Sequence, residues 1–233
     1  MLTLAVTTST SVMGVAVAGD GDVLAARVEP TERRHAERLL PLALEALAAA
    51  GVGLGDVERL AVDVGPGLFT GLRVGLATVG GLARALEVEV VTASSLFLLA
   101  AGAGGTGEVL SVIDARRGEV FAQPFDIGAG VVRPLGPAVV VDPAVPLATL
   151  TGGVSDRAFL RVVGDGAVRY GQRFEEAGCT VVDGSPSVHE LARRADQLDR
   201  SPTRVPTPSY LREPDARIGA WTTRTATAGA TRS

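Results

Sequence analysis

The residues most capable of chemistry in this 233-residue chain are few and widely separated. His35 and His189 are its two histidines, Cys179 is its one cysteine, and Asp63 and Asp114 end apolar runs that are typical of strands. A zinc site needs three or four clustered ligands, and neither histidine has a second one at helical spacing. A hydrolytic triad would need the same distant histidines. We therefore expect no metal, no cofactor and no hydrolytic site, and we interpret Cys179 as a buried apolar residue.

The composition excludes further classes of chemistry. All 22 basic residues are arginines, so a P-loop lysine and a Schiff-base lysine are impossible. A net charge of -4 disfavours independent binding of nucleic acid, and tRNA contact is expected only through a complex. A single cysteine fits a reducing cytoplasm. The sequence has no 18-residue apolar stretch without charges, so we predict a cytoplasmic protein without membrane insertion.

The strongest local pattern is the glycine-rich segment 65–75, Gly-Pro-Gly-Leu-Phe-Thr-Gly-Leu-Arg-Val-Gly, between a predicted strand and a predicted helix. Such a loop can approach a phosphate at the start of a helix, with Thr70 as a possible cap. No lysine and no acidic metal ligand follow in the motif, so it would be a weak phosphate site alone.

The alternative is close packing of helices. Small residues recur along the predicted helix, and several of them fall on one helix face: Gly71, Gly75, Ala77, Thr78, Gly80 and Gly81. Glycine costs about 1 kcal/mol per helical position relative to alanine, so compensating contacts are expected. We favour a helix–helix interface, and the spacing leaves open whether the partner helix is internal or belongs to another subunit.

Hydrophobic patterning predicts the elements that position these residues. The first half reads as strands 2–8, 12–18 and 23–28, helix 35–50 with Gly51 as its C-terminal cap, strand 59–64, helix 69–86, strand 88–92 and a helix near 94–101. The second half reads as strands 109–114, 119–125 and 131–141, a short helix near 143–150, strand 159–163, helix 167–177, strand 180–182 and helix 188–198. A βββαβα unit therefore occurs twice, which predicts an α/β fold of two halves around a cleft.

The chain is divided accordingly. We predict an N-terminal subdomain at 1–103, a smaller C-terminal subdomain at 104–200, a returning C-terminal segment at 201–221 and a disordered tail at 222–233. Residues 201–209, rich in proline and threonine, are expected to be extended. The charged turn around Asp114, Arg116, Arg117 and Glu119 is interpreted as a hairpin with cross-strand ion pairs. The segment 164–166 could approach a ribose or phosphate, and it is equally well a turn that starts a helix.

Five stretches resemble the TsaB (YeaZ) family. Segment 65–75 is similar to its GPGxFTGLRVG signature, 4–10 to its opening strand and turn, and 35–41 to its HxxxxLP segment. Segment 113–121 is similar to its IDARxGEVY hairpin and 208–212 to its PxYLR tail. They follow the family order across nearly the whole chain.

The resemblance implies a fold like that of actin, Hsp70 and sugar kinases, and a role in adding threonylcarbamoyl to N6 of adenosine in tRNAs that read codons starting with A. The chain would be the non-catalytic scaffold, paired with a catalytic TsaD-type paralogue, joined by a TsaE-type ATPase subunit, and a homodimer when alone. The helices 35–50 and 69–86 would form the interface. Its expected residues are His35, Leu39, Leu42, Phe69, Thr70, Gly71, Leu72, Val74, Gly75, Thr78, Val79 and Leu82.

One departure concerns the first turn, where the family usually has Asp-Thr-Ser and this chain has Thr7-Thr8-Ser9. The early aspartate serves metal–phosphate chemistry in related ATPases, so its absence argues against nucleotide hydrolysis. Two alternatives remain. One is an ATP-dependent small-molecule kinase or ATPase of the same fold, which would use Asp63 or Asp114 and the glycine loops. The other is a metalloprotease, a label of the wider superfamily, against which the histidine count argues.

Overall fold

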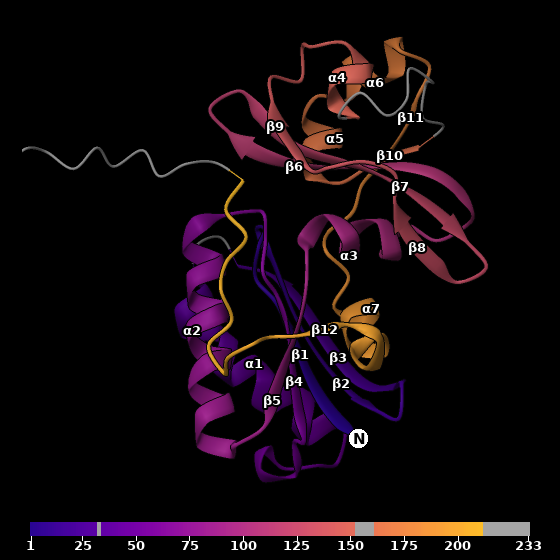
Figure 1. The fold of residues 1–233 in the computed structure, drawn as a ribbon. Coiled ribbons are helices and arrows are strands. Elements are labelled where there is room, and N and C mark those ends of the chain that lie inside the picture. The colour runs from indigo at the N-terminus through magenta and orange to yellow at the C-terminus, as the bar shows by residue number, and fades with distance from the viewer. Residues whose placement is uncertain (32–33, 152–160, 212–233) are drawn as a thin grey trace, which may run out of the picture.

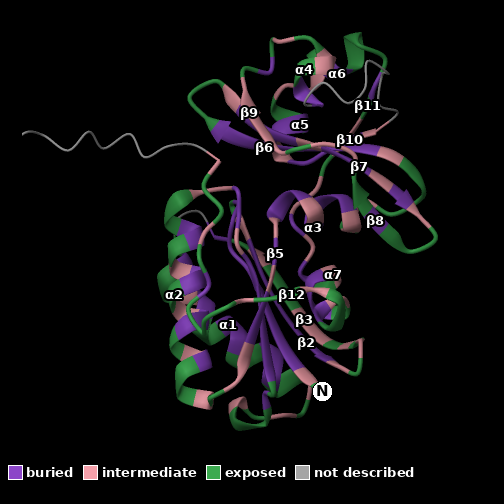
Figure 2. Ribbon diagram, viewed as in Figure 1, coloured by how far each residue is buried: buried purple, intermediate pink, exposed green. Residues whose placement is uncertain are grey.

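The computed structural model describes residues 1–31, 34–151 and 161–211 of the chain. Two β-sheets, each with its own helices, form two subdomains, and helix α3 lies between them (Figure 1). Purple buried strands fill the centre of each subdomain, and green exposed positions follow the outer faces of the helices (Figure 2).

The first sheet has the strand order β12-β5-β4-β1-β2-β3. Strands β1 to β3 are antiparallel neighbours, and β4 and β5 extend the sheet in parallel to β1. The bounds are β1 Leu2–Thr7, β2 Val12–Gly19, β3 Asp22–Pro30, β4 Arg59–Asp63, β5 Glu89–Ala93 and β12 Asp199–Arg200.

The second sheet has the order β11-β10-β6-β7-β8, with β9 also paired to β7. Its central strand β6 corresponds to β1 of the first sheet. Strand β6 pairs antiparallel with β7, the next strand in sequence, and parallel with β10, which follows a helical crossover. The bounds are β6 Gly107–Arg116, β7 Glu119–Gly128, β8 Val131–Pro134, β9 Val139–Val141, β10 Arg161–Val163 and β11 Thr180–Val182. Because β5-β4-β1-β2-β3 and β11-β10-β6-β7-β8 have the same topology, the predicted duplication and α/β fold class are confirmed.

The helices cover the sheets and connect them. Their bounds are α1 His35–Ala49, η1 Leu54–Asp56, α2 Phe69–Leu86, α3 Ser95–Gly102, α4 Leu147–Leu150, α5 Asp165–Arg169, α6 Gly171–Glu176, α7 Val188–Arg193 and η2 Ala195–Gln197. Helices α1 and α2 share one core with the first sheet, while α7 packs with the alanine-rich opposite face of that sheet.

Three predicted elements differ from the structure. The strand predicted at 131–141 is broken into β8 and β9 at Pro134, Gly136 and Pro137, because proline has no N–H to donate to the ladder, and β9 pairs with β7 in a different register from β8. The helix predicted at 167–177 is two short helices that meet at Tyr170, and the helix predicted at 188–198 ends early and continues as η2. Short apolar runs do not encode such breaks strongly.

The last elements of the second predicted unit, α7 and β12, pack with the first sheet. Helix α7 joins a core of the first sheet through Val188 and Leu191, and β12 pairs with β5. Residues 188–200 therefore belong with the N-terminal sheet, although they follow the C-terminal sheet in sequence. The predicted tail 222–233 and the part of the returning segment after Leu211 lie outside the described residues.

Candidate partner-binding surface

Helix α1 is amphipathic. Its buried residues Leu39, Leu42, Ala46 and Leu47 recur at helical spacing and pack in the first core. The helix ends at the predicted capping glycine, in a Schellman arrangement: Gly51 takes φ +73°, its N–H donates to Ala48 O, and the next N–H donates to Leu47 O. One face of α1 is thus fixed against the sheet, and the other is left to solvent.

His35 begins α1 but faces inward, where it is 4% exposed. Its Nε2 lies 3.0 Å from Thr31 Oγ1 and 3.1 Å from Thr10 O. The imidazole therefore connects the end of β3, the first turn and the start of α1. This is a structural position, and His35 is not available to a partner.

Gly67, just before α2, and two glycines within α2 accommodate the first turn of the same chain. A Cβ at Gly67 would lie 2.1 Å from Ser9 O, one at Gly71 would lie 2.1 Å from Thr8 O, and one at Gly75 would lie 2.2 Å from Thr8 Oγ1. The N–H of Leu68 donates to Ser9 O at 2.6 Å. These glycines permit an intramolecular approach between the turn and the helix, which was the alternative that their spacing left open.

The predicted interface residues consequently divide into two groups. Phe69 and Thr70 are exposed, and Val74, Thr78 and Leu82 are half-buried. The remaining seven are buried within this chain, namely His35, Leu39, Leu42, Gly71, Leu72, Gly75 and Val79. Thr70 is the second residue of α2 and does not cap it; the N-terminal cap position is Leu68, without a side-chain hydrogen bond.

The accessible faces consist largely of residues that the prediction omitted. On α1, Leu40 and Leu44 are 43% and 48% exposed. On α2 the exposed row at four-residue spacing is Phe69, Arg73, Ala77, Gly81 and Ala85. The sequence held this signal, because a row offset from the buried row must face outward.

Asp63 and Asp114, the acidic candidates for an enzyme of this fold, belong to strands of different sheets, β4 and β6. Asp63 is fully buried, and its Oδ1 accepts hydrogen bonds from Gly65 N–H and Ser95 Oγ–H. Burial raises the pKa of Asp63, against the opposing effect of these hydrogen bonds. Asp63 thus joins β4, the glycine loop and α3, and a side chain without solvent access is a poor ligand for a substrate-bound metal.

Asp114 is held in the second subdomain by its own hairpin. Its carboxylate accepts from Arg116 N–H, pairs with the Arg116 guanidinium at 3.0 Å and lies 3.5 Å from Arg169. Asp165 accepts from Asp114 N–H, and burial raises the pKa of Asp165. Asp114 is therefore ion-paired in a charged hairpin, but its two arginine neighbours come from the same strand, β6, and from α5, not from the opposite strand as predicted.

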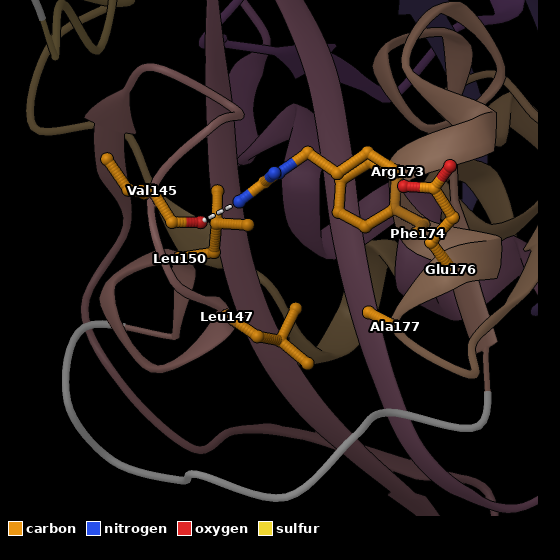
Figure 3. A pocket seen from close by; sticks show the side chains of 7 residues that line it. All are labelled: Val145, Leu147, Leu150, Arg173, Phe174, Glu176 and Ala177. Atoms are coloured by element: carbon orange, nitrogen blue, oxygen red, sulfur yellow. Dashed lines mark hydrogen bonds between the residues drawn. The ribbon is translucent and has the colours of Figure 1, made fainter.

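Two hollows lie away from α1 and α2. One, of about 190 Å³, separates the first turn from α7 and is lined by Thr7, Gly14, Ser187 and His189 among others, without a carboxylate among its described lining residues. The other, of about 230 Å³, lies between α4 and α6 and is lined mainly by apolar side chains (Figure 3); there Arg173 donates to Val145 O at 2.7 Å. The described residues contain no group of three or more histidine, cysteine, aspartate or glutamate side chains that could hold a metal ion.

Among the described residues, every helix lacks the length or the apolar character that crossing a membrane requires.

Comparison with known proteins gives a consistent assignment. Residues 28–153 match the family model described as "TsaD: tRNA N6-adenosine threonylcarbamoyltransferase". A Pseudomonas aeruginosa structure, described as an uncharacterized protein with similarity to peptidase YeaZ, is 31% identical with a TM-score of 0.74. The similarity covers 91% of this chain and 99% of that one. The chain belongs to the TsaB (YeaZ) family.

Among relatives of this TsaB family member, Escherichia coli "tRNA threonylcarbamoyladenosine biosynthesis protein TsaB" is 40% identical over 124 residues. That match covers 52% of this chain and 53% of the E. coli protein, so it spans about half of each. The Mycobacterium tuberculosis protein Rv3421c, described as uncharacterized, is 35% identical over 220 residues, which are 92% of this chain and 93% of that protein.

Proposed function

We propose that this TsaB-family chain acts in the biosynthesis of threonylcarbamoyladenosine in tRNA, as a non-catalytic scaffold that pairs with a TsaD-type catalytic paralogue. The observation that carries the proposal is the distribution of exposed apolar side chains. Of the ten large hydrophobic residues exposed in the described chain, five lie on α1, on α2 and on the segment that follows β12: Leu40, Leu44, Phe69, Val205 and Tyr210. Gathered apolar exposure is typical of protein interfaces.

The paired helices suit a partner with the same fold. They pack on one face of the first sheet, and exposed positions follow their outer faces (Figures 1 and 2). A paralogue offering the corresponding helices would meet them in a pseudo-symmetric four-helix contact. A second copy of this chain would offer the same geometry, so we propose a homodimer in the absence of the paralogue. In this scheme a TsaE-type ATPase joins the pair, and tRNA binds only to the complex.

The first test is co-purification of the tagged chain with the paralogue from its own organism, followed by a threonylcarbamoylation assay on tRNA with and without this chain. We expect a one-to-one complex and loss of modification when the chain is omitted. A chain that neither binds the paralogue nor affects modification would refute the proposal.

A matched pair of variants locates the contact. Leu44→Glu places a charge on the exposed face of α1, where Leu44 is 48% exposed. Val168→Glu places the same charge on α5, where Val168 is 51% exposed. Burying an unpaired charge is costly, so Leu44→Glu should weaken the complex by at least about tenfold in Kd. Val168→Glu should bind like the unmodified chain, and equal loss in both variants would argue against the assigned face.

A further inference from the structure

The segment 201–210, here called the strap, returns the chain along the whole length of α2. It starts beside β5, where Ser201 N–H donates to Val90 O at 2.8 Å. Arg204 then donates to Glu87 O at the C-terminal end of α2, at 3.2 Å. Ser209 N–H finally donates to Val64 O at 2.8 Å, beside the glycine loop. The strap therefore runs antiparallel to α2 (Figure 1).

The strap delivers one aromatic ring to the start of α2. The rings of Tyr210 and Phe69 lie 5.7 Å apart between centroids, and the Arg73 guanidinium carbon lies 3.8 Å from the Phe69 centroid. Tyr210 remains 45% exposed and Phe69 52% exposed. A surface cluster of two aromatic rings and one arginine thus combines residues that are far apart in the sequence.

The charge of this cluster is not balanced locally. Among the described residues, no carboxylate lies within ion-pair distance of Arg73, in contrast to Arg38 and Arg59, which each contact two. The sequence of α2 contains Arg73 and Arg84 and no acidic residue from position 69 to 86. A partner that covers this face would bind most strongly if it offered carboxylates opposite the arginines.

We propose that Tyr210, Phe69 and Arg73 form the energetic centre of the partner-binding surface, with the strap as a third interface element beside α1 and α2. This inference rests on the proposed function and specifies its partner: a TsaD-type chain that presents an acidic side chain to Arg73 and an apolar one to the two rings. Aromatic residues and arginine are the types that dominate binding energy at interfaces. The strap fixes Tyr210 before binding, which reduces the entropy lost on association.

The test measures Kd between the full-length chain and the co-expressed paralogue by isothermal titration calorimetry at low and high salt. Tyr210→Ala and Arg73→Glu should each raise Kd by at least about tenfold. The effect of Arg73→Glu should shrink at high salt, because salt screens the attraction between Arg73 and a carboxylate of the partner. The doubly substituted Phe69→Ala/Tyr210→Ala chain should lose less binding free energy than the sum of the two single losses, because each substitution already removes the same contact between the two rings.

Arg133→Glu, which reverses an exposed charge on β8, is the matched control and should leave Kd unchanged. Circular dichroism of each variant verifies the fold. If the unmodified chain binds and Tyr210→Ala and Arg73→Glu bind equally well, the inference is wrong while the proposed function stands. If the unmodified chain does not bind, both fall. If the variants abolish only self-association and leave paralogue binding intact, the surface belongs to a second copy and the assigned partner is wrong.

Discussion

Replacing Gly71 by alanine tests whether the glycines of α2 serve the fold or a partner. The added Cβ would lie 2.1 Å from Thr8 O and 3.2 Å from His35 Nε2. The first of these is a backbone atom whose neighbour, Ser9 O, accepts a hydrogen bond from Leu68 N–H, so the turn cannot move aside cheaply. Overpacking costs about 1–3 kcal/mol, occasionally more, and alanine regains up to about 1 kcal/mol of helix propensity. We expect a net loss of about 2 kcal/mol.

The assay is chemical or thermal unfolding of the purified chain, with Gly81→Ala as the control in the same helix. A Cβ at Gly81 meets no atom within 4 Å, so this variant should gain about 1 kcal/mol. For a chain of this length, Gly71→Ala should lower the melting temperature by about 4–8 °C, and Gly81→Ala should raise it by about 2–4 °C. A Gly71→Ala chain of normal stability that fails to bind the paralogue would refute the intramolecular assignment.

Two further predictions concern buried charge. Because burial raises the pKa of Asp63, the folded chain binds its proton more tightly than the unfolded chain, so stability should fall as pH rises above the unfolded value of about 4. Asp63→Asn should therefore equal or exceed the unmodified chain in stability at pH 7–8 and lose that advantage near pH 4; an identical pH profile for both would contradict this. Arg59, whose side chain is 5% exposed, bonds Glu89 at 2.7 Å and also Asp196, so Glu89→Ala should cost about 1–3 kcal/mol in denaturant unfolding. The exposed control Glu175→Ala should stay within about 0.5 kcal/mol, and equal effects of the two would count against the ion pair.

The sequence predicts the long, periodic elements accurately. Helix α2 begins and ends where its pattern predicts, and α1 differs by one residue at its C-terminal end. Both have strong apolar periodicity, and α1 also has the Gly51 cap, which are local signals. The second half has short helices without such signals, and there the prediction merged α5 with α6 and β8 with β9.

The direction in which the small residues face could not be read from their spacing. Gly71 and Gly75 define a face of α2, but what covers that face is the turn at Thr8, more than 60 positions earlier in the chain. The same limitation applies to α7, whose packing on the first sheet depends on the path of the chain through the second one. Local patterns encode which residues share a face, and only the fold determines what that face meets.

The inward direction of the glycines nevertheless determines the outward surface. With Gly71 and Gly75 against the first turn, the helical repeat turns the row from Phe69 through Arg73 away from the core. The opening turn and the strap contact α2 at different positions: Thr8 approaches Gly71 and Gly75, and Val205 approaches Gly80. Substitutions at the glycines should reduce partner binding only through loss of the fold, whereas substitutions at Arg73 should reduce binding in a chain that remains folded. Measuring stability and Kd on the same variants separates the two roles.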